Sequence, residues 1–348
     1  MAGKRLNKKL VFTALGLFLA GVTVASLAAG QVKVPIESLL AVVGRQLGLP
    51  AELLGAVPTP EQIAVIWHIR LPRTLVGVLV GAALGVSGAV MQGVFGNPLA
   101  DPGIIGVSAG ASLGAVIAVS LGLTSISLYY MPLFALIGAV LAVATTVALS
   151  MRDGKIPVMT LLLAGVAVSM FTGAVTSAIL TFMNEYRLRE FLFWMVGGLD
   201  YRRWEHVYLA IGPVVVGILI LCFLARHLNI LVLGEQEARA VGMPVAFFRM
   251  LLLCVSAVTT ASAVCVSGSI GFVGLVVPHI MRMLIGPEHR ALLPACALTG
   301  AIFLLACDTV GRLLIPPAEI RVGIVTALTG APYFLYLLRR AQKAGRLQ

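Results

Sequence analysis

Three arginines are the residues of this sequence whose chemistry is easiest to state. Arg70 and Arg73 flank Pro72 at the start of a long apolar run, and Arg312 closes a later one. A guanidinium group holds a carboxylate in a two-pronged geometry, so a fixed arginine cluster can receive acidic side chains. The alternative is that each arginine reaches from an apolar helix to the polar edge of a membrane. Asp308 stands one turn before Arg312 and could neutralise its charge locally.

A short polar segment later in the chain has the composition of a docking element. Within residues 228–249, the sequence GEQEARAVG predicts a two-turn helix of Glu235 to Val241 between two glycines. A helix this short is marginal on its own, so we expect it to bind another protein. The alternative is a solvated loop. The residues that we assign to this contact are Gly234, Glu235, Ala238, Arg239 and Gly242.

The sequence contains no recognisable catalytic or metal-binding pattern. It has no GxxxxGK[ST] phosphate loop, no GxSxG and no HExxH, so we expect no catalytic residue and no ATP hydrolysis in this chain. The five cysteines form no CxxC pair, and His279 has no second ligand at a useful spacing. We therefore expect neither a cofactor nor a metal site.

The composition is that of a membrane protein. The 348 residues are 59% hydrophobic and 11% charged, whereas soluble domains have roughly 25% charged residues. The net charge is +11, but the basic residues stand at the ends of apolar runs without interleaved aromatic residues, which argues against nucleic-acid binding. We expect a single transmembrane domain over residues 1–348, surrounded by membrane lipid.

Apolar runs close to the ~20 residues that cross a bilayer predict an all-α polytopic protein with about ten transmembrane helices. Two longer polar segments, 31–69 and 183–204, should form short helices at the membrane surface. The seventh and eighth spans nearly merge at residues 267–269. The predicted spans are 10–30, 70–93, 103–122, 130–150, 158–182, 205–225, 247–266, 270–286, 292–314 and 322–338.

The basic residues predict the orientation of these spans. Most of the 25 lysines and arginines fall on one side when the N-terminus is cytoplasmic, as the positive-inside rule requires. With an even number of spans, both termini are then cytoplasmic. The first apolar run is about as long as one bilayer crossing, so we expect a retained span rather than a cleaved signal peptide. The residues behind this assignment include Lys4, Arg5, Arg152, Lys155 and Arg346.

Glycine recurs at every fourth position in two successive apolar runs. Every fourth residue of a helix lies on nearly one face, and small residues there let membrane helices approach closely. The alternative is that glycine is simply frequent in membrane helices. The residues that we assign to helix packing are Gly77, Gly81 and Gly85, followed by Gly106, Gly110 and Gly114.

The sequence also resembles a known family. RLPRT at residue 70, SGAVMQGVFGNPLADPGIIGVSAGA at residue 87 and EIRVGIVTALTGAP at residue 319 are similar to the FecCD-type permeases of ATP-binding cassette (ABC) importers. The resemblance implies a homodimer in a bacterial inner membrane, with two ATPase subunits inside and a solute-binding protein outside. It implies an iron–siderophore cargo first and haem second, with cobalamin as the alternative.

The same resemblance assigns roles to the motifs above. Arg70, Arg73 and Arg312 match positions that receive glutamates of the binding protein, and residues 228–242 match the coupling helices that contact the ATPase. Two other classes of membrane protein fit the sequence less well. An ion-driven transporter needs acids within the membrane, and Asp308, the nearest candidate, lies towards one end of its span. An intramembrane enzyme would need catalytic residues that the sequence lacks.

Overall fold

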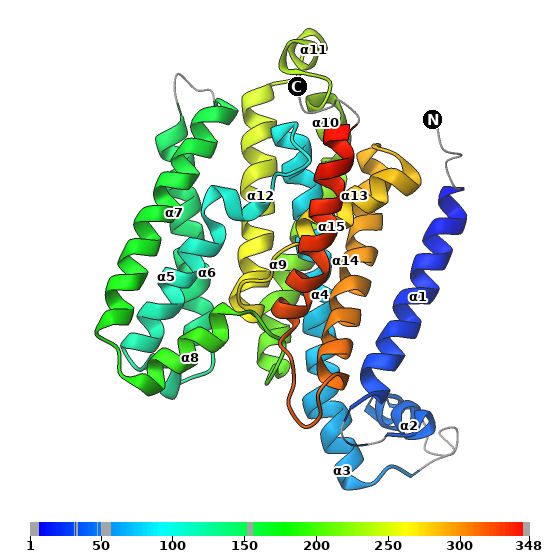
Figure 1. Ribbon diagram of the computed structural model, residues 1–348. Helices are drawn as coiled ribbons and strands as arrows, with labels where there is room; N and C mark the ends of the chain where they lie inside the picture. Colours follow the sequence, from blue (N-terminus) through cyan, green and yellow to red (C-terminus); the bar gives the residue numbers. More distant parts are fainter. Residues whose placement is uncertain are drawn as a thin grey trace.

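The computed structural model describes residues 7–343 apart from 31, 33, 47, 50–56 and 152–155. Lys4, Arg5, Arg152, Lys155 and Arg346, which were used to assign the orientation, lie outside the described residues. The described part of the chain is built from helices, as predicted (Figure 1).

Helices are found in all ten predicted spans. Within the described residues, seven are long and apolar enough to cross a membrane. They are α1 (Lys8–Ala28), the continuous helix Pro60–Phe95 that ends in α4 (Leu71–Phe95), α6 (Tyr130–Ser150), α7 (Val158–Thr181), α9 (Trp204–Phe223), α12 (Val245–Ser267) and α14 (His289–Leu313). Shorter apolar helical stretches are α5 (Val107–Ser120), α13 (Val273–Ile285) and the first part, Val322–Tyr336, of α15 (Val322–Lys343). How many of the ten cross the membrane stays a prediction.

Short helices lie between the spans. The surface segments contain α2 (Ile36–Gln46), α3 (Pro60–Ile63) and α8 (Glu185–Met195), and α10 (Ala225–Leu231) and α11 (Glu235–Ala240) follow α9. The seventh and eighth spans are separate helices, because the chain leaves α12 at Gly268, where φ is +73°. This left-handed conformation favours glycine and ends a helix.

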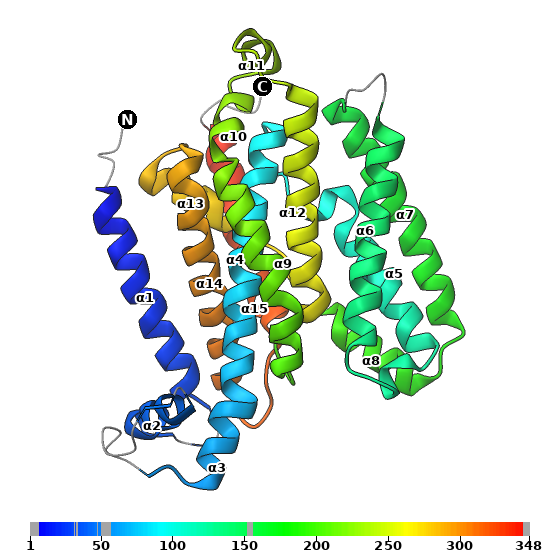
Figure 2. The same cartoon turned by 180° about the vertical axis from the view of Figure 1, so that it is seen from behind.

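Helix α4 is the central element of the fold. It packs against α9, α12, α13 and α14, while α5, α6 and α7 form a separate group beyond α12 (Figures 1 and 2). The first glycine series explains how closely α4 and α14 approach. A Cβ atom at Gly81 would lie 2.3 Å from the Gly300 carbonyl oxygen, and one at Gly85 would lie 2.5 Å from that of Cys296.

The second glycine series divides into two roles. A Cβ atom at Gly114 would lie 1.9 Å from the Phe134 carbonyl oxygen, and one at Gly110 would lie 2.4 Å from that of Gly138, so both sit where α5 meets α6. Gly106 is different from the prediction: it lies outside the helix, with φ +90°. Pro102 starts a 3₁₀ turn, η3 (Pro102–Ile105), and Gly106 supplies the left-handed residue between that turn and α5.

The two ends of the molecule carry different elements. Helix α1 begins and α15 ends at the end that carries α11, which we call the α11 end (Figures 1 and 2). Helices α2, α3 and α8 lie at the opposite end, which we call the α8 end. Both outermost described helices therefore have their free ends on the same side, an arrangement that suits an even number of crossings.

Candidate functional site

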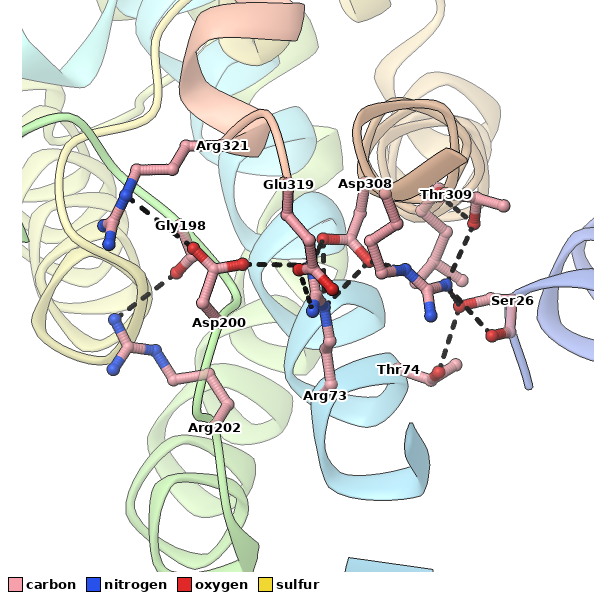
Figure 3. Close-up of polar contacts among 12 residues, drawn as sticks. Ser26, Arg73, Thr74, Gly198, Asp200, Arg202, Asp308, Thr309, Glu319 and Arg321 are labelled. Carbon is pink, nitrogen blue, oxygen red and sulfur yellow. Dashed lines mark hydrogen bonds and ion pairs between the residues drawn. The ribbon is translucent and has the colours of Figure 1, made fainter. Parts of the chain in front are cut away.

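Arg73 is the centre of a charged cluster at the α8 end, on the first turn of α4 (Figure 3). Its Nη2 donates to Asp308 Oδ1 at 2.8 Å and to Asp200 Oδ1 at 3.1 Å. Its Nη1 donates to Glu319 Oε2 at 2.8 Å, and its Nε donates to Asp308 Oδ2 at 3.1 Å. One guanidinium group thus joins α4, α14, the α8–α9 connection and the α14–α15 connection.

Asp308 is the most deeply buried acid of this cluster. Its side chain is 2% exposed. Besides Arg73, it forms an ion pair with Arg312, which stands one turn later on α14. The Arg312 Nε lies 3.3 Å from Asp308 Oδ2. The prediction that Asp308 neutralises Arg312 locally is therefore confirmed. Removing Asp308 would leave the buried Arg312 without an acidic partner among the described residues, which is strongly destabilising.

The other two predicted arginines hold the end of α1. Arg312 Nη2 donates to the Ser26 carbonyl oxygen at 3.0 Å, and its Nη1 donates to that of Ala29 at 3.2 Å. Arg70 Nη1 donates to the Leu27 carbonyl oxygen at 2.8 Å. The last carbonyl groups of a helix have no partner within it, and cationic side chains stabilise that end. Arg70 and Arg312 therefore fix α1 against the rest of the molecule.

The structure brings the three predicted arginines to one end but does not leave them free. All three are less than 9% exposed, and each donates to acceptors of its own chain. Recognition of an external carboxylate by these residues stays a prediction. It applies best to Arg73, since the acceptors of Arg73 are carboxylates.

Sequence reasoning missed three members of the cluster: Asp200, Glu319 and Arg321. Asp200 pairs with Arg321 Nε at 3.7 Å as well as with Arg73. Burial raises the pKa of the Asp200 carboxyl, and the two arginines act in the opposite direction. A signal was present, because the chain has only 14 acidic residues, and both missed acids flank predicted spans on the same side as Arg73.

Arg321 connects the cluster to α8. Its Nη1 donates to the Phe193 carbonyl oxygen, and its guanidinium carbon lies 4.6 Å from the centre of the Phe193 ring. Nearby, Arg202 Nη2 donates to the Gly198 carbonyl oxygen at 3.3 Å (Figure 3). Burial lowers the pKa of the Arg202 guanidinium to about 10. The cluster is therefore continuous with the segment that follows α8.

Helix α11, at the opposite end, has the bounds that the sequence predicted to within one residue. Gly234 and Gly242 flank it with φ of +129° and +80°. Glu235 accepts from Arg239 on the next turn and from Arg249 Nη2 on α12 at 3.2 Å. The chain itself therefore holds α11 in place, which the sequence did not indicate.

The two faces of α11 differ. Ala238 is fully buried and packs with Met243 and Val245, so it anchors the helix rather than meeting a partner. Leu233 and Val241, at the two ends of α11, are 70% and 68% exposed. These apolar side chains are the part of the segment that a second protein can reach. Docking of α11 on such a protein stays a prediction.

In the described part of the chain, no three His, Cys, Asp or Glu side chains are grouped so that they could hold a metal ion. The cysteines are all free. His279 lies beside the ring of Tyr333, with 6.3 Å between the ring centres. The main polar interactions of the candidate site are therefore those in which arginines bind carboxylates and the carbonyl oxygens at a helix end.

Known proteins resemble this chain over most of its length. The sequence model of the FecCD transport family matches residues 17–340. The cobalamin import system permease of Halobacterium salinarum is 48% identical over 83% of this chain and 77% of that protein. The hemin transport system permease of Yersinia pestis is 42% identical over 86% of this chain and 91% of that protein. A solved metal-chelate type ABC transporter in an inward-facing conformation superposes with a TM-score of 0.83 at 34% identity, covering 96% of this chain and all of that one.

Proposed function

Because this chain belongs to the FecCD transport family, it is a multi-pass inner-membrane permease of an ABC importer, and we propose that it carries cobalamin or, second, haem. The observation that supports this cargo is the 48% identity to a permease named for cobalamin, with a permease named for hemin at 42%. The family resemblance of the sequence implied iron–siderophore complexes first. The named relatives favour the cobalamin alternative at least as strongly, so we change that order.

The family works with an ABC ATPase and a solute-binding protein. We infer that two copies of this chain enclose the pathway, with an ATPase subunit on each α11 and a binding protein at the α8 end. The exposed Leu233 and Val241 beside α11 support the first contact. The acid-binding chemistry of Arg73 supports the second, since it already holds carboxylates in two-pronged fashion.

In this arrangement the ATPase supplies the energy, the binding protein selects the cargo and the permease provides the pathway. ATP binding shifts the permease between conformations only if the ATPase contacts α11 differently in the two states. Charged residues are scarce within the candidate spans, so we expect the pathway lining to be mostly apolar and to hold its cargo weakly. The binding protein then supplies the specificity.

Transport by the purified system tests the proposal. The permease is reconstituted in proteoliposomes with and without its ATPase and its cargo-loaded binding protein, and uptake of radiolabelled cyanocobalamin is compared with uptake of haemin. We expect ATP-dependent cobalamin uptake that needs both partners. Uptake of haemin alone would reverse the order of cargoes, and uptake of neither would refute the proposed cargo class. Concentrative uptake by the permease alone would contradict its place in an ABC importer.

A further inference from the structure

All three nitrogens of the Arg73 guanidinium already donate to acids of the same chain, which limits how an external carboxylate can bind there. Its Nε and both Nη atoms donate to carboxylates of its own chain. The Nε–Nη2 edge is held by Asp308, and the Nη1–Nη2 edge is shared by Glu319 and Asp200. An incoming carboxylate can gain a two-pronged grip only if one of these acids leaves. An additional anion would also meet three like charges.

The three acids differ in how firmly they are held. Asp308 is 2% exposed and also bound by Arg312. Asp200 is 14% exposed and also bound by Arg321. The Glu319 side chain is 34% exposed, and within the described residues its only ion pair is the one with Arg73. Water can therefore solvate Glu319 when it leaves, whereas Asp308 is shielded from water and is also held by Arg312.

Glu319 also occupies a position from which its release would reach other elements. It lies on the connection between α14 and α15 (Figure 3). The next residue, Ile320, donates its backbone N–H to the Gly311 carbonyl oxygen at 3.0 Å. Arg321 follows and is bound to Phe193 of α8 and to Asp200. Through the next two residues, Glu319 is thus connected to the start of α15 and the end of α8.

We propose that Glu319 is an internal substitute for the docking carboxylate of the binding protein, so that docking exchanges Glu319 for an external acid on Arg73. Asp308 and Asp200 stay in place during the exchange. This inference rests on the proposed function, because it requires a binding protein at the α8 end. It makes the Glu319–Arg73 pair a competitor of docking, and it makes residues 315–321 the segment released when docking occurs.

Binding measurements on the permease–ATPase complex in nanodiscs test the exchange, with the cyanocobalamin-loaded binding protein as probe. Glu319→Gln keeps the shape of the side chain and removes the competing charge. We expect it to tighten docking roughly tenfold, within the usual range of coupling between sites. Glu185→Gln is the control. Glu185 lies at the same end but pairs with Arg189 instead of Arg73, so removing its charge should leave the affinity unchanged. Equal or weaker docking of Glu319→Gln would overturn the exchange.

Two further measurements separate the exchange from docking itself. Arg73→Lys cannot hold two carboxylates in fork geometry, so it should weaken docking. If Arg73→Lys weakens docking while Glu319→Gln leaves it unchanged, docking at Arg73 stands and the exchange is refuted. If neither variant changes docking, both ideas are wrong. Hydrogen exchange of residues 315–321 should rise when the binding protein is added to the wild type. It should already be high in Glu319→Gln, and no rise in the wild type would also refute the exchange.

Discussion

Arg70, Arg73 and Arg312 use the same guanidinium group in three ways. Arg73 binds carboxylates from three segments, Arg70 binds carbonyl oxygens at the end of α1, and Arg312 does both. Their five donors in a fixed plane make this possible, and a lysine at any of these positions would lose it. The use of each arginine follows from which acceptors the fold brings within reach.

At the residue scale, the contact of Gly81 with Gly300 yields a prediction. Gly81→Ala would place a methyl group 2.3 Å from a backbone oxygen of α14, which only a shift of the helix can relieve. We expect a cost of about 1–3 kcal/mol, typical of overpacking. It should appear as a lower thermal midpoint of the purified protein in detergent.

A matched control for Gly81→Ala is available on α1. No atom would lie within 4 Å of a Cβ atom at Gly21, so Gly21→Ala should keep the midpoint or raise it slightly, because alanine favours the helix. If the two variants unfold at the same temperature, the close approach of α4 and α14 does not constrain the fold.

At the element scale, the approach to α4 shows how one proline changes a helix. The sequence predicts that the second span begins at residue 70, but a continuous helix begins at Pro60. Residues Ala64–Arg70 have π-helical hydrogen bonding. Pro72 has no N–H to donate to the carbonyl group four residues earlier, and the wider π turns precede it. Such stretches are frequent at functional positions, and this one ends at Arg70.

Helix α11 carries a prediction about assembly. Val241 is 68% exposed at its end, so Val241→Glu should weaken binding of the ATPase subunit roughly tenfold or more by placing a charge in an apolar contact. Pull-down of the ATPase by the detergent-solubilised permease measures this effect. Val57 is 94% exposed and belongs to the segment before α3 at the α8 end. Val57→Glu should leave assembly unchanged, and equal loss in both variants would contradict docking through α11.

At the scale of the whole molecule, the two ends should face different compartments. We expect the α11 end to be cytoplasmic, because the positive-inside rule places most basic segments there. Green fluorescent protein fused to the C-terminus should fluoresce, since it would fold in the cytoplasm. Alkaline phosphatase fused after Leu128, in the α5–α6 connection, should be active. The reverse pattern would show that the predicted orientation is wrong.

The charged clusters lie at the two ends of the molecule. Arg73, Asp308 and their partners gather at the α8 end, whereas Glu235, Arg239 and Arg249 gather at the α11 end. The spans between them keep charge out of the membrane, where it is costly. The two ends are connected by α4 and α14, which pack through glycines along their contact. A closely packed central pair of helices is suited to carry a displacement from one end to the other.

Several features could be predicted from the sequence because their causes are local. The length of an apolar run decides whether a helix can span a membrane, and the ten runs coincide with helices of the structure. Glycines at every fourth position indicated close packing, and flanking glycines marked α11. Gly106 is not one of these packing glycines, because the 3₁₀ turn that starts at Pro102 places it before α5.

The partners of the arginines were decided only by the tertiary structure. Arg73 is separated along the chain from Asp200, Asp308 and Glu319 by 127, 235 and 246 residues. No periodicity or spacing encodes contacts over such distances, because they depend on how α4, α14 and two connections meet at one end. The sequence by itself determined which residues can bind a carboxylate. The packing of the helices determined which carboxylates they bind, and which of these remains exposed enough to leave.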